Sequence, residues 1–194
     1  ADLMYKQVKS WDWGNSGSKT IYHDTETRRN SITYRGNLAR LIEALINEDE
    51  LDKAEEVADI AMKNMPVDQF GYYTLLEPYI NAYYEVKAKD KARKLFKDVA
   101  VKYQESLKYY SELPVEDQEE NFTEIITDIE RYKALIDVVI DYDKEFGKKE
   151  SMTFNNYLRL FEHFYQGDEP EEEMIPNERD LETAVDTFSG LKLD

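Results

Sequence analysis

The sequence contains no cysteine, which excludes a disulfide framework, a thiolate zinc site and a thiol nucleophile. Histidine occurs only at His23 and His163, which lack metal-ligand spacing, so we expect neither a metal site nor a cofactor. No run approaches the roughly 20 consecutive apolar residues that a transmembrane helix needs. The chain also starts without the basic region and apolar stretch of a signal peptide, and we expect a processed protein or an excised soluble piece.

Positive charge is scarce, because 25 lysines and arginines stand against 42 acidic residues, for a formal net charge of -17. This excess of negative charge repels the phosphate backbone of nucleic acids, so we expect no nucleic-acid partner. The stretch "WDWGNSGSKT" resembles a phosphate-binding loop, but Trp13 and Ser18 occupy the positions where G-x-x-x-x-G-K-[S/T] needs glycine. We therefore interpret it as an ordinary loop in which Gly14 and Gly17 supply positive φ angles.

Glycine and proline, the residues that usually interrupt helices, number only 7 and 5. Between them, apolar residues recur every three or four positions, which is the period of a helix with one buried face. The expected helices cover residues 31–48, 51–65, 70–86, 90–110, 116–146, 151–165 and 177–188. Pro78 is expected to kink the third helix, and Ser151 or Thr153 to cap the sixth. The sequence therefore predicts an all-α protein.

Two of the expected helix pairs resemble each other at an offset of 38 residues, as between Leu41 and Tyr79. The identical triplet "DKA" occurs at residues 52–54 and again at 90–92. This pattern resembles the tetratricopeptide repeat, in which small residues let paired helices approach closely. The matching positions, counted from Arg35, are Leu38, Leu41, Leu45, Ala54, Ala58, Ala61 and Pro66. Ile42 departs from the pattern, and an unrelated bundle of helical hairpins is the alternative.

The resemblance to tetratricopeptide repeats predicts three regions. Residues 1–30 form an irregular lead-in loop packed on the repeats. Residues 31–166 form tetratricopeptide-like helical hairpins, stacked as a short right-handed solenoid. Residues 167–194 form an acidic linker and a short C-terminal helix. In the helix register that the repeat implies, the side chains of Tyr79 and Tyr83 point into the core.

Three stretches resemble one known family: "WGN" at residues 13–15, "DTETRR" at 24–29 and "RGNLARLIEAL" at 35–45. They are similar to the soluble C-terminal region of an uncharacterised bacterial family of multi-span membrane proteins related to protein O-mannosyltransferases. The resemblance implies the soluble domain of a membrane-embedded glycosyltransferase-like protein, membrane-associated through an upstream region and periplasmic or otherwise extracytoplasmic. No catalytic residue of such a transferase maps onto this chain. Trp11 and Trp13 are expected to pack on the first hairpin.

In tetratricopeptide modules, the first helix of each unit lines a concave groove. The corresponding positions give a candidate binding site made of Glu43, Asn47, Glu77, Asn81, Tyr84 and Glu85. We expect Tyr84 to be its main anchor and Asn81 its orienting hydrogen-bonding group. Some tetratricopeptide modules bind the C-terminal carboxylate of a peptide with a lysine. Glu77 occupies the position of that lysine in this sequence. Any ligand is therefore expected to be neutral or basic at the contact, or to be an internal segment.

Three classes of function compete for this chain. The preferred one is a non-catalytic helical-repeat module for protein–protein interaction or intramolecular docking, whose partner is a protein or peptide, or its own membrane domain. The alternative is a glycan-recognition accessory domain of the transferase, which needs exposed aromatic platforms and acidic hydrogen-bonding groups. A free-standing enzyme is disfavoured because the sequence contains no catalytic constellation.

Overall fold

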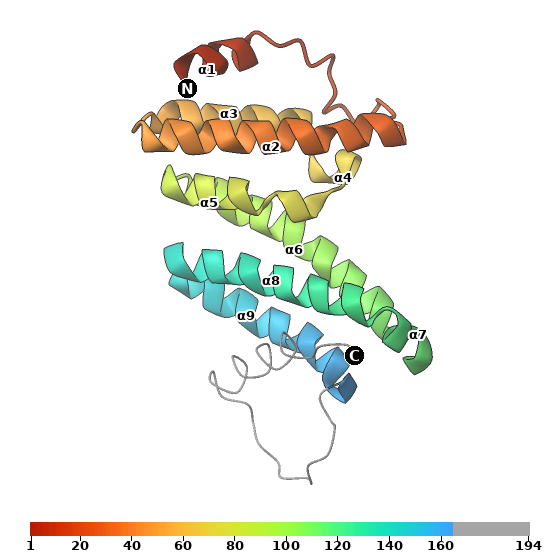
Figure 1. The fold of residues 1–194 in the computed structure, drawn as a ribbon. Coiled ribbons are helices and arrows are strands. Elements are labelled where there is room, and N and C mark those ends of the chain that lie inside the picture. Colours follow the sequence, from red (N-terminus) through yellow and green to blue (C-terminus); the bar gives the residue numbers. More distant parts are fainter. Residues whose placement is uncertain (165–194) are drawn as a thin grey trace. The chain divides into compact units, whose positions relative to one another are not determined.

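The computed structural model describes residues 1–164, which form helices with no strand among them (Figure 1). The prediction of an all-α protein is therefore confirmed for this part of the chain. The chain divides into two compact units, residues 1–102 and the residues from 103 onward. The acidic linker and C-terminal helix predicted over residues 167–194 lie outside the described residues.

The first hairpin of unit 1 pairs α2 (Thr25–Asn47) with α3 (Leu51–Asn64) (Figure 1). Asp24 caps the start of α2, because its carboxylate oxygen Oδ1 accepts a hydrogen bond from the Thr27 amide at 2.7 Å. The two helices bury an apolar set in which α3 contributes mainly alanine: Leu38, Ile42, Leu45, Ala54, Val57, Ala58 and Ala61. The small alanine side chains allow the two helix backbones to approach closely.

The second hairpin consists of α5 (Glu77–Glu85) and α6 (Lys89–Ser111), and its turn repeats that of the first at an offset of 38 residues. Asp49 and Lys87 occupy equivalent positions and have positive φ angles of 58° and 65°. In both turns the next residue donates its amide to the carbonyl oxygen five residues earlier, at 2.9 Å and 2.8 Å. The internal repeat is thus visible as a repeated turn, and the right-handed tetratricopeptide solenoid stays a prediction.

Replacing Asp49 or Lys87 by glycine is expected to stabilise the protein by about 0.5–1 kcal/mol, because glycine adopts a positive φ without a steric penalty. The measurement is the urea midpoint of unfolding, followed by far-UV circular dichroism. The control is Arg40→Gly in the interior of α2, which should destabilise by about 1 kcal/mol because helix propensity falls. If all three substitutions destabilised the protein, the positive φ angles of Asp49 and Lys87 would not be a source of strain.

The helix predicted over residues 70–86 consists instead of α4 (Val67–Phe70), a 3-10 turn η1 (Tyr73–Leu75) and α5. Gly71 interrupts the chain with φ 67° and ψ -143°, a conformation that is essentially restricted to glycine. Pro78 lies in the first turn of α5, where its missing amide has no helical partner to lose. The predicted kink at Pro78 is therefore wrong, since this proline helps to begin a helix.

A buried arginine of α2 holds this interruption in place. Arg35 is 0% exposed, and its guanidinium donates hydrogen bonds to the carbonyl oxygens of Met65 at 2.7 Å, Gly71 at 2.6 Å and Tyr72 at 3.3 Å. The hydroxyl of Tyr79 donates to the carbonyl oxygen of Arg35 at 2.7 Å. Burial lowers the pKa of Arg35 to about 10, so the guanidinium remains charged at neutral pH. Arg35 therefore ties α2 to the chain reversal that leads into α5.

The lead-in predicted as a loop over residues 1–30 is only partly a loop, because it begins with α1 (Asp2–Lys9). The loop that follows α1 packs tightly on the end of α3. A Cβ atom on Gly17 would lie 1.9 Å from the carbonyl oxygen of Lys63, so glycine is needed there for close approach. The predicted positive φ is therefore wrong for Gly17, whereas Gly14 has φ 54°.

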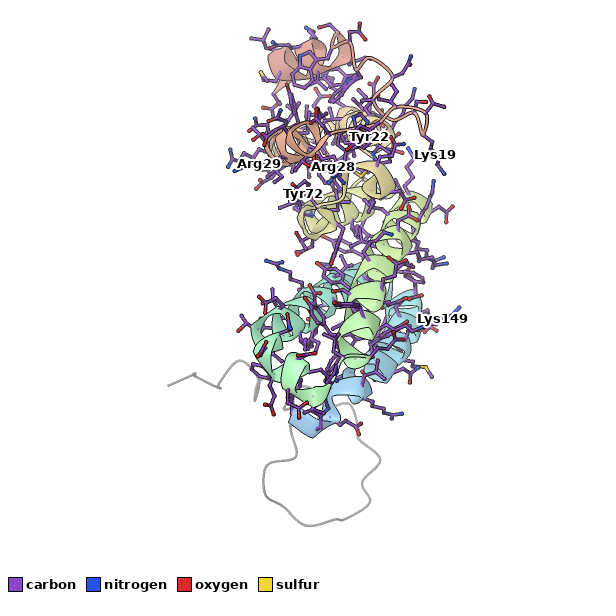
Figure 2. All side chains as sticks on the ribbon, turned by 90° about the vertical axis from the view of Figure 1, so that its right-hand side faces the viewer. Lys19, Tyr22, Arg28, Arg29, Tyr72 and Lys149 are labelled. Atoms are coloured by element: carbon purple, nitrogen blue, oxygen red, sulfur yellow. The ribbon has the colours of Figure 1, made fainter. Side chains whose placement is uncertain are left out.

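Several basic residues of unit 1 lie near the start of α2. Figure 2 shows Lys19 and Tyr22 of the lead-in on the side of unit 1 that also carries Arg28 and Arg29. Tyr22 is 86% exposed. Asp24 and Glu26 lie in the same stretch, so the basic residues near the start of α2 are interleaved with acidic ones.

Unit 2 comprises the end of α6 and the following elements: α7 (Val115–Glu120), α8 (Phe122–Tyr142), α9 (Lys144–Leu158) and the 3-10 segment η2 (Arg159–Phe164). The single helix predicted over residues 116–146 is wrong, because the chain turns at Asp143 with φ -145° and ψ 70°. Ser151 lies inside α9, where its hydroxyl donates to the carbonyl oxygen of Gly147 at 2.9 Å. The predicted cap at Ser151 or Thr153 is therefore also wrong.

Two tyrosines, Tyr103 and Tyr132, are buried in the mainly aliphatic core of unit 2. The ring of Tyr132 stacks on Tyr103 at a centroid distance of 5.7 Å and meets Phe154 edge-on at 5.2 Å. Its hydroxyl accepts a hydrogen bond from Gln104 Nε2 at 2.6 Å. This arrangement buries the ring and satisfies the polar end, which is the usual requirement for a buried tyrosine.

Candidate functional site

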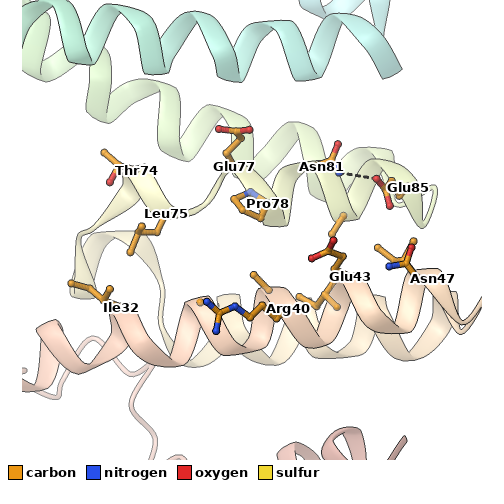
Figure 3. A pocket seen from close by; sticks show the side chains of 15 residues that line it. Ile32, Arg40, Glu43, Asn47, Thr74, Leu75, Glu77, Pro78, Asn81 and Glu85 are labelled. Atoms are coloured by element: carbon orange, nitrogen blue, oxygen red, sulfur yellow. Dashed lines mark hydrogen bonds between the residues drawn. The ribbon is translucent and has the colours of Figure 1, made fainter. Parts of the chain in front are cut away.

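A groove with a volume of about 630 Å³ lies in unit 1 between α2 and the segment formed by η1 and α5 (Figure 3). This volume is within the range of small-ligand and peptide side-chain pockets. Five of the six predicted site residues line it: Glu43, Asn47, Glu77, Asn81 and Glu85. The structure therefore brings together residues from two hairpins that are about 40 positions apart in the sequence.

One wall of the groove is the face of α2 that does not pack on α3. Gly36, Ala39, Glu43 and Asn47 lie along it at intervals of three or four residues, as the helical period requires. A Cβ atom added to Gly36 would have no neighbour within 4 Å, so the space beside it is open. Gly36 and Ala39 have small side chains, so this end of α2 projects little into the groove. Glu43 and Asn47 lie at the other end.

The opposite wall is the exposed face of α5. Asn81 Nδ2 donates a hydrogen bond to Glu85 Oε1 at 2.8 Å, one helical turn further on (Figure 3). This bond fixes the orientation of the carboxamide and leaves its oxygen to accept a hydrogen bond from a ligand. Asn81 can therefore act as the orienting group that the sequence predicts at this position.

Tyr84 is the predicted site residue that the structure does not place in the groove. Its side chain is only 6% exposed, and it packs with the buried residues of unit 1. Tyr84 follows Asn81 by three residues, which turns its side chain about 60° away from the groove-facing direction on a helix of 3.6 residues per turn. The predicted position of Tyr84 in the groove is therefore wrong.

The groove has an acidic character. Glu43, Glu77 and Glu85 contribute three carboxylates, and Arg40 is the one basic residue among the lining side chains. The lining residues include no histidine, serine or lysine, and Thr74 is the one hydroxyl side chain among them. The groove's carboxylate, carboxamide and hydroxyl groups can accept hydrogen bonds from a ligand, and the carboxylates favour positive charge at the contact.

Sequence reasoning missed the apolar part of the groove. Ile32, Leu75 and Pro78 line it, and the first two side chains are each 37% exposed. Leu75 and Pro78 were predicted within a continuous helix, and the break before α5 is what presents them to the groove. The signal that could have revealed them is the sequence Gly71 to Pro78, since glycine and proline commonly bound helices.

No group of three or more histidine, aspartate or glutamate residues among residues 1–164 is arranged to hold a metal ion. In the same part of the chain, every helix is too short or too polar to cross a bilayer. Comparison with protein families, with curated proteins and with solved structures gave no match.

Proposed function

We propose that this chain is a non-catalytic helical-repeat module that binds a polypeptide segment in the groove between α2 and α5. The observation that carries the proposal is the shared groove of Glu43, Asn47, Glu77, Asn81 and Glu85, which two separate hairpins contribute. Two rigid helical walls joined through the Arg35 contacts provide a preorganised surface, which lowers the entropic cost of binding.

The proposed ligand is an internal segment that is basic or neutral where it meets the groove. Lysine and arginine carry long apolar stems, which can lie on Ile32, Leu75 and Pro78 while the charged ends reach the glutamates. Free carbonyl and amide groups of an extended segment can pair with the Asn81 carboxamide. A terminal carboxylate at Glu77 would instead meet electrostatic repulsion.

Replacing Glu77 by glutamine is expected to weaken binding of a lysine-rich peptide selected from a peptide array about two- to fivefold, as for one partly exposed ion pair. The matched control is Glu26→Gln, because Glu26 also lies in the first turn of a helix but outside the groove. The measurement is a fluorescence-anisotropy titration of the labelled peptide at two salt concentrations. Equal affinities for both variants, or no salt dependence, would exclude the groove as a basic-segment site.

The partner is either a separate polypeptide or the membrane domain of the same protein. The second possibility comes from the resemblance to a glycosyltransferase-like membrane protein, with the module on the extracytoplasmic side. Reading the gene upstream of Ala1 tests it, because about a dozen apolar segments there, each of roughly 20 residues, would supply the membrane domain. A coding region without such segments would leave only a separate partner.

A glycan-recognition accessory domain is the second candidate function. The groove lacks the aromatic platforms that this function needs, since no aromatic residue lines it. Partly exposed aromatic rings and a nearby carboxylate do occur together elsewhere in unit 1, in a second pocket lined by the lead-in and α2.

A further inference from the structure

The second pocket lies where the lead-in crosses the first half of α2, and its volume is about 540 Å³. Three of its four aromatic side chains, Trp11, Trp13 and Tyr34, lie on its outer side. Met65 and Phe70 also line it and are only 2% and 4% exposed, so its inner surface is apolar. The pocket is separate from the groove, because no residue lines both.

The three outer rings form one packed cluster, in which Tyr34 is 48% exposed and Trp11 and Trp13 are partly exposed. The centroid of Trp11 lies 5.5 Å from that of Trp13 and 6.0 Å from that of Tyr34, and Trp13 lies 6.4 Å from Tyr34. These are the distances of rings in direct edge-to-face contact. An aromatic cage around a quaternary ammonium ion needs rings spread apart by the cation, so this cluster does not form such a cage.

Polar groups surround the rings. Asp12 Oδ1 accepts a hydrogen bond from the Gly14 amide at 2.9 Å, which leaves its second carboxylate oxygen open. The Asn30 carboxamide, the Tyr34 hydroxyl and the two indole N–H groups form no hydrogen bond within residues 1–164. The pocket therefore offers both donors and acceptors beside aromatic faces.

The lead-in is held in place by hydrogen bonds to the rest of unit 1. Ser16 Oγ donates to the carbonyl oxygen of Asn64 at 2.7 Å, and His23 Nε2 contacts the carbonyl oxygen of Ser16 at 2.7 Å. Gln69 Nε2 donates to the carbonyl oxygen of Gly17 at 2.9 Å. These contacts fix the loop on the C-terminal side of the two tryptophans.

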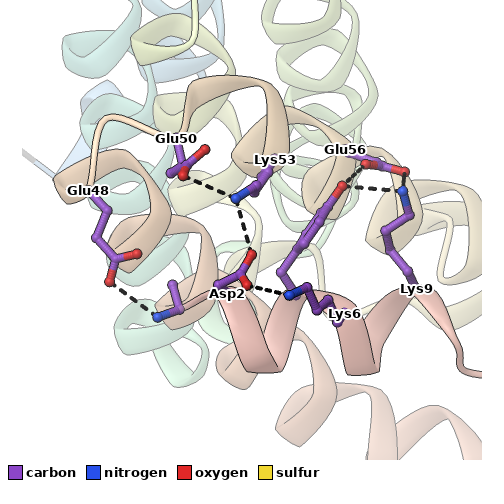
Figure 4. A network of polar contacts seen from close by, with 9 residues as sticks. Asp2, Lys6, Lys9, Glu48, Glu50, Lys53 and Glu56 are labelled. Carbon is purple, nitrogen blue, oxygen red and sulfur yellow. Dashed lines mark hydrogen bonds and ion pairs between the residues drawn. The ribbon is translucent and has the colours of Figure 1, made fainter.

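On the N-terminal side, α1 is attached to α3 by the polar network of Figure 4. Lys53 pairs with Asp2 at 3.1 Å, and Lys9 pairs with Glu56 at 2.9 Å. Val8, which is 1% exposed, adds the buried apolar contact of α1. Both ends of the segment that carries the tryptophans are thus anchored, and the pocket is preorganised.

We propose that this pocket binds a neutral saccharide. The apolar C–H face of a pyranose ring carries partial positive charge and packs on the negative face of an aromatic ring. Its hydroxyls are both donors and acceptors, so they can donate to Asp12 and pair with the Asn30 carboxamide at the same time. The inference goes beyond polypeptide binding in the groove and does not depend on it.

Other ligands that favour aromatic surfaces fit less well. A phosphate or an acidic sugar would be repelled by the Asp12 carboxylate. A proline-rich segment presents carbonyl acceptors but lacks proline N–H donors, so it would cover the free oxygen of Asp12 without a hydrogen bond. The mixture of donor and acceptor groups therefore favours a polyhydroxy ligand.

The chain has two tryptophans, and both line this pocket, so intrinsic tryptophan fluorescence reports on the site directly. The experiment titrates the full chain with methyl glycosides of glucose, galactose and mannose, and separately with a decaproline peptide. The expected result is a saturable fluorescence change with at least one methyl glycoside and none with the peptide. A change with the peptide alone, or with no probe, would overturn the proposal.

Two variants locate the effect. Asn30→Ala is expected to weaken saccharide binding about tenfold, because a ligand hydroxyl loses its partner. Asn37→Ala is the matched control, since Asn37 is also exposed and lies two turns further along α2 outside the pocket. Equal affinities for these variants would overturn the assignment. Glu77→Gln in the groove should leave the saccharide titration unchanged. Saccharide binding in this pocket and polypeptide binding in the groove are therefore tested separately.

Discussion

Arg35→Met is expected to lower the free energy of unfolding of unit 1 by about 3 kcal/mol or more. The guanidinium supplies hydrogen bonds to three carbonyl oxygens around the chain reversal before α5. Methionine has a similar length but no donor, and each buried carbonyl left unpaired costs about 1–3 kcal/mol. The measurement is a urea titration followed by tryptophan fluorescence, which reports on unit 1 because Trp11 and Trp13 both belong to it.

The control for this prediction is Arg29→Met, because Arg29 is exposed on the same helix. An exposed substitution of this kind usually changes stability by less than about 0.5 kcal/mol. Arg35→Lys should also destabilise, since a single ammonium group cannot reproduce the planar fork that reaches several carbonyl oxygens. Equal urea midpoints for Arg35→Met and Arg29→Met would show that the buried hydrogen bonds contribute little.

The hairpins and most of the groove could be predicted because both follow from helical periodicity. Leu38, Ile42 and Leu45 identify the face of α2 that packs on α3, and the neighbouring face then carries Glu43 and Asn47. Because the second hairpin repeats the first at an offset of 38 residues, the groove-facing positions of α2 predict those of α5. This offset placed Glu77, Asn81 and Glu85 correctly on the second wall.

Tertiary contacts explain what periodicity could not predict. Arg35 is buried although charged residues usually lie at the surface, because backbone carbonyls from a distant turn accept hydrogen bonds from both of its terminal nitrogens. The short helix α1 has only Val8 buried, and helices of this length are marginal without tertiary support. Tyr84 is buried although the repeat register predicted that it faces the groove, because its side chain packs with the core of unit 1.

The end of α8 is another feature that no residue pattern marked, and Gly147 explains how the hairpin that follows can close. A Cβ atom at Gly147 would lie 2.6 Å from Ile140 Cγ1 and 2.9 Å from Ile140 Cα. The backbone of α9 thus approaches α8 so closely that only glycine fits without a shift. Helix continuity through Asp143 was predicted from apolar spacing, which carries no information on this contact.

Gly147→Ala is therefore expected to destabilise unit 2 by about 1–3 kcal/mol, as overpacking of a close contact does. The reason is specific to this contact, because alanine is favoured over glycine in an open helix by about 1 kcal/mol. Gly36→Ala in α2 is the control, since its Cβ would meet nothing within 4 Å and φ is not positive. Gly36→Ala should stabilise by about 0.5–1 kcal/mol.

The two substitutions are the same chemical change in two helices, and the predicted effects have opposite signs. Far-UV circular dichroism during urea titration measures the loss of helix in both units, and tryptophan fluorescence isolates unit 1, where Gly36 lies. Gly147→Ala should lower the midpoint of the dichroism curve while the fluorescence curve stays in place. Stabilisation by both alanines would mean that α8 and α9 can separate at little cost, and that the close approach at Gly147 is not what determines this hairpin.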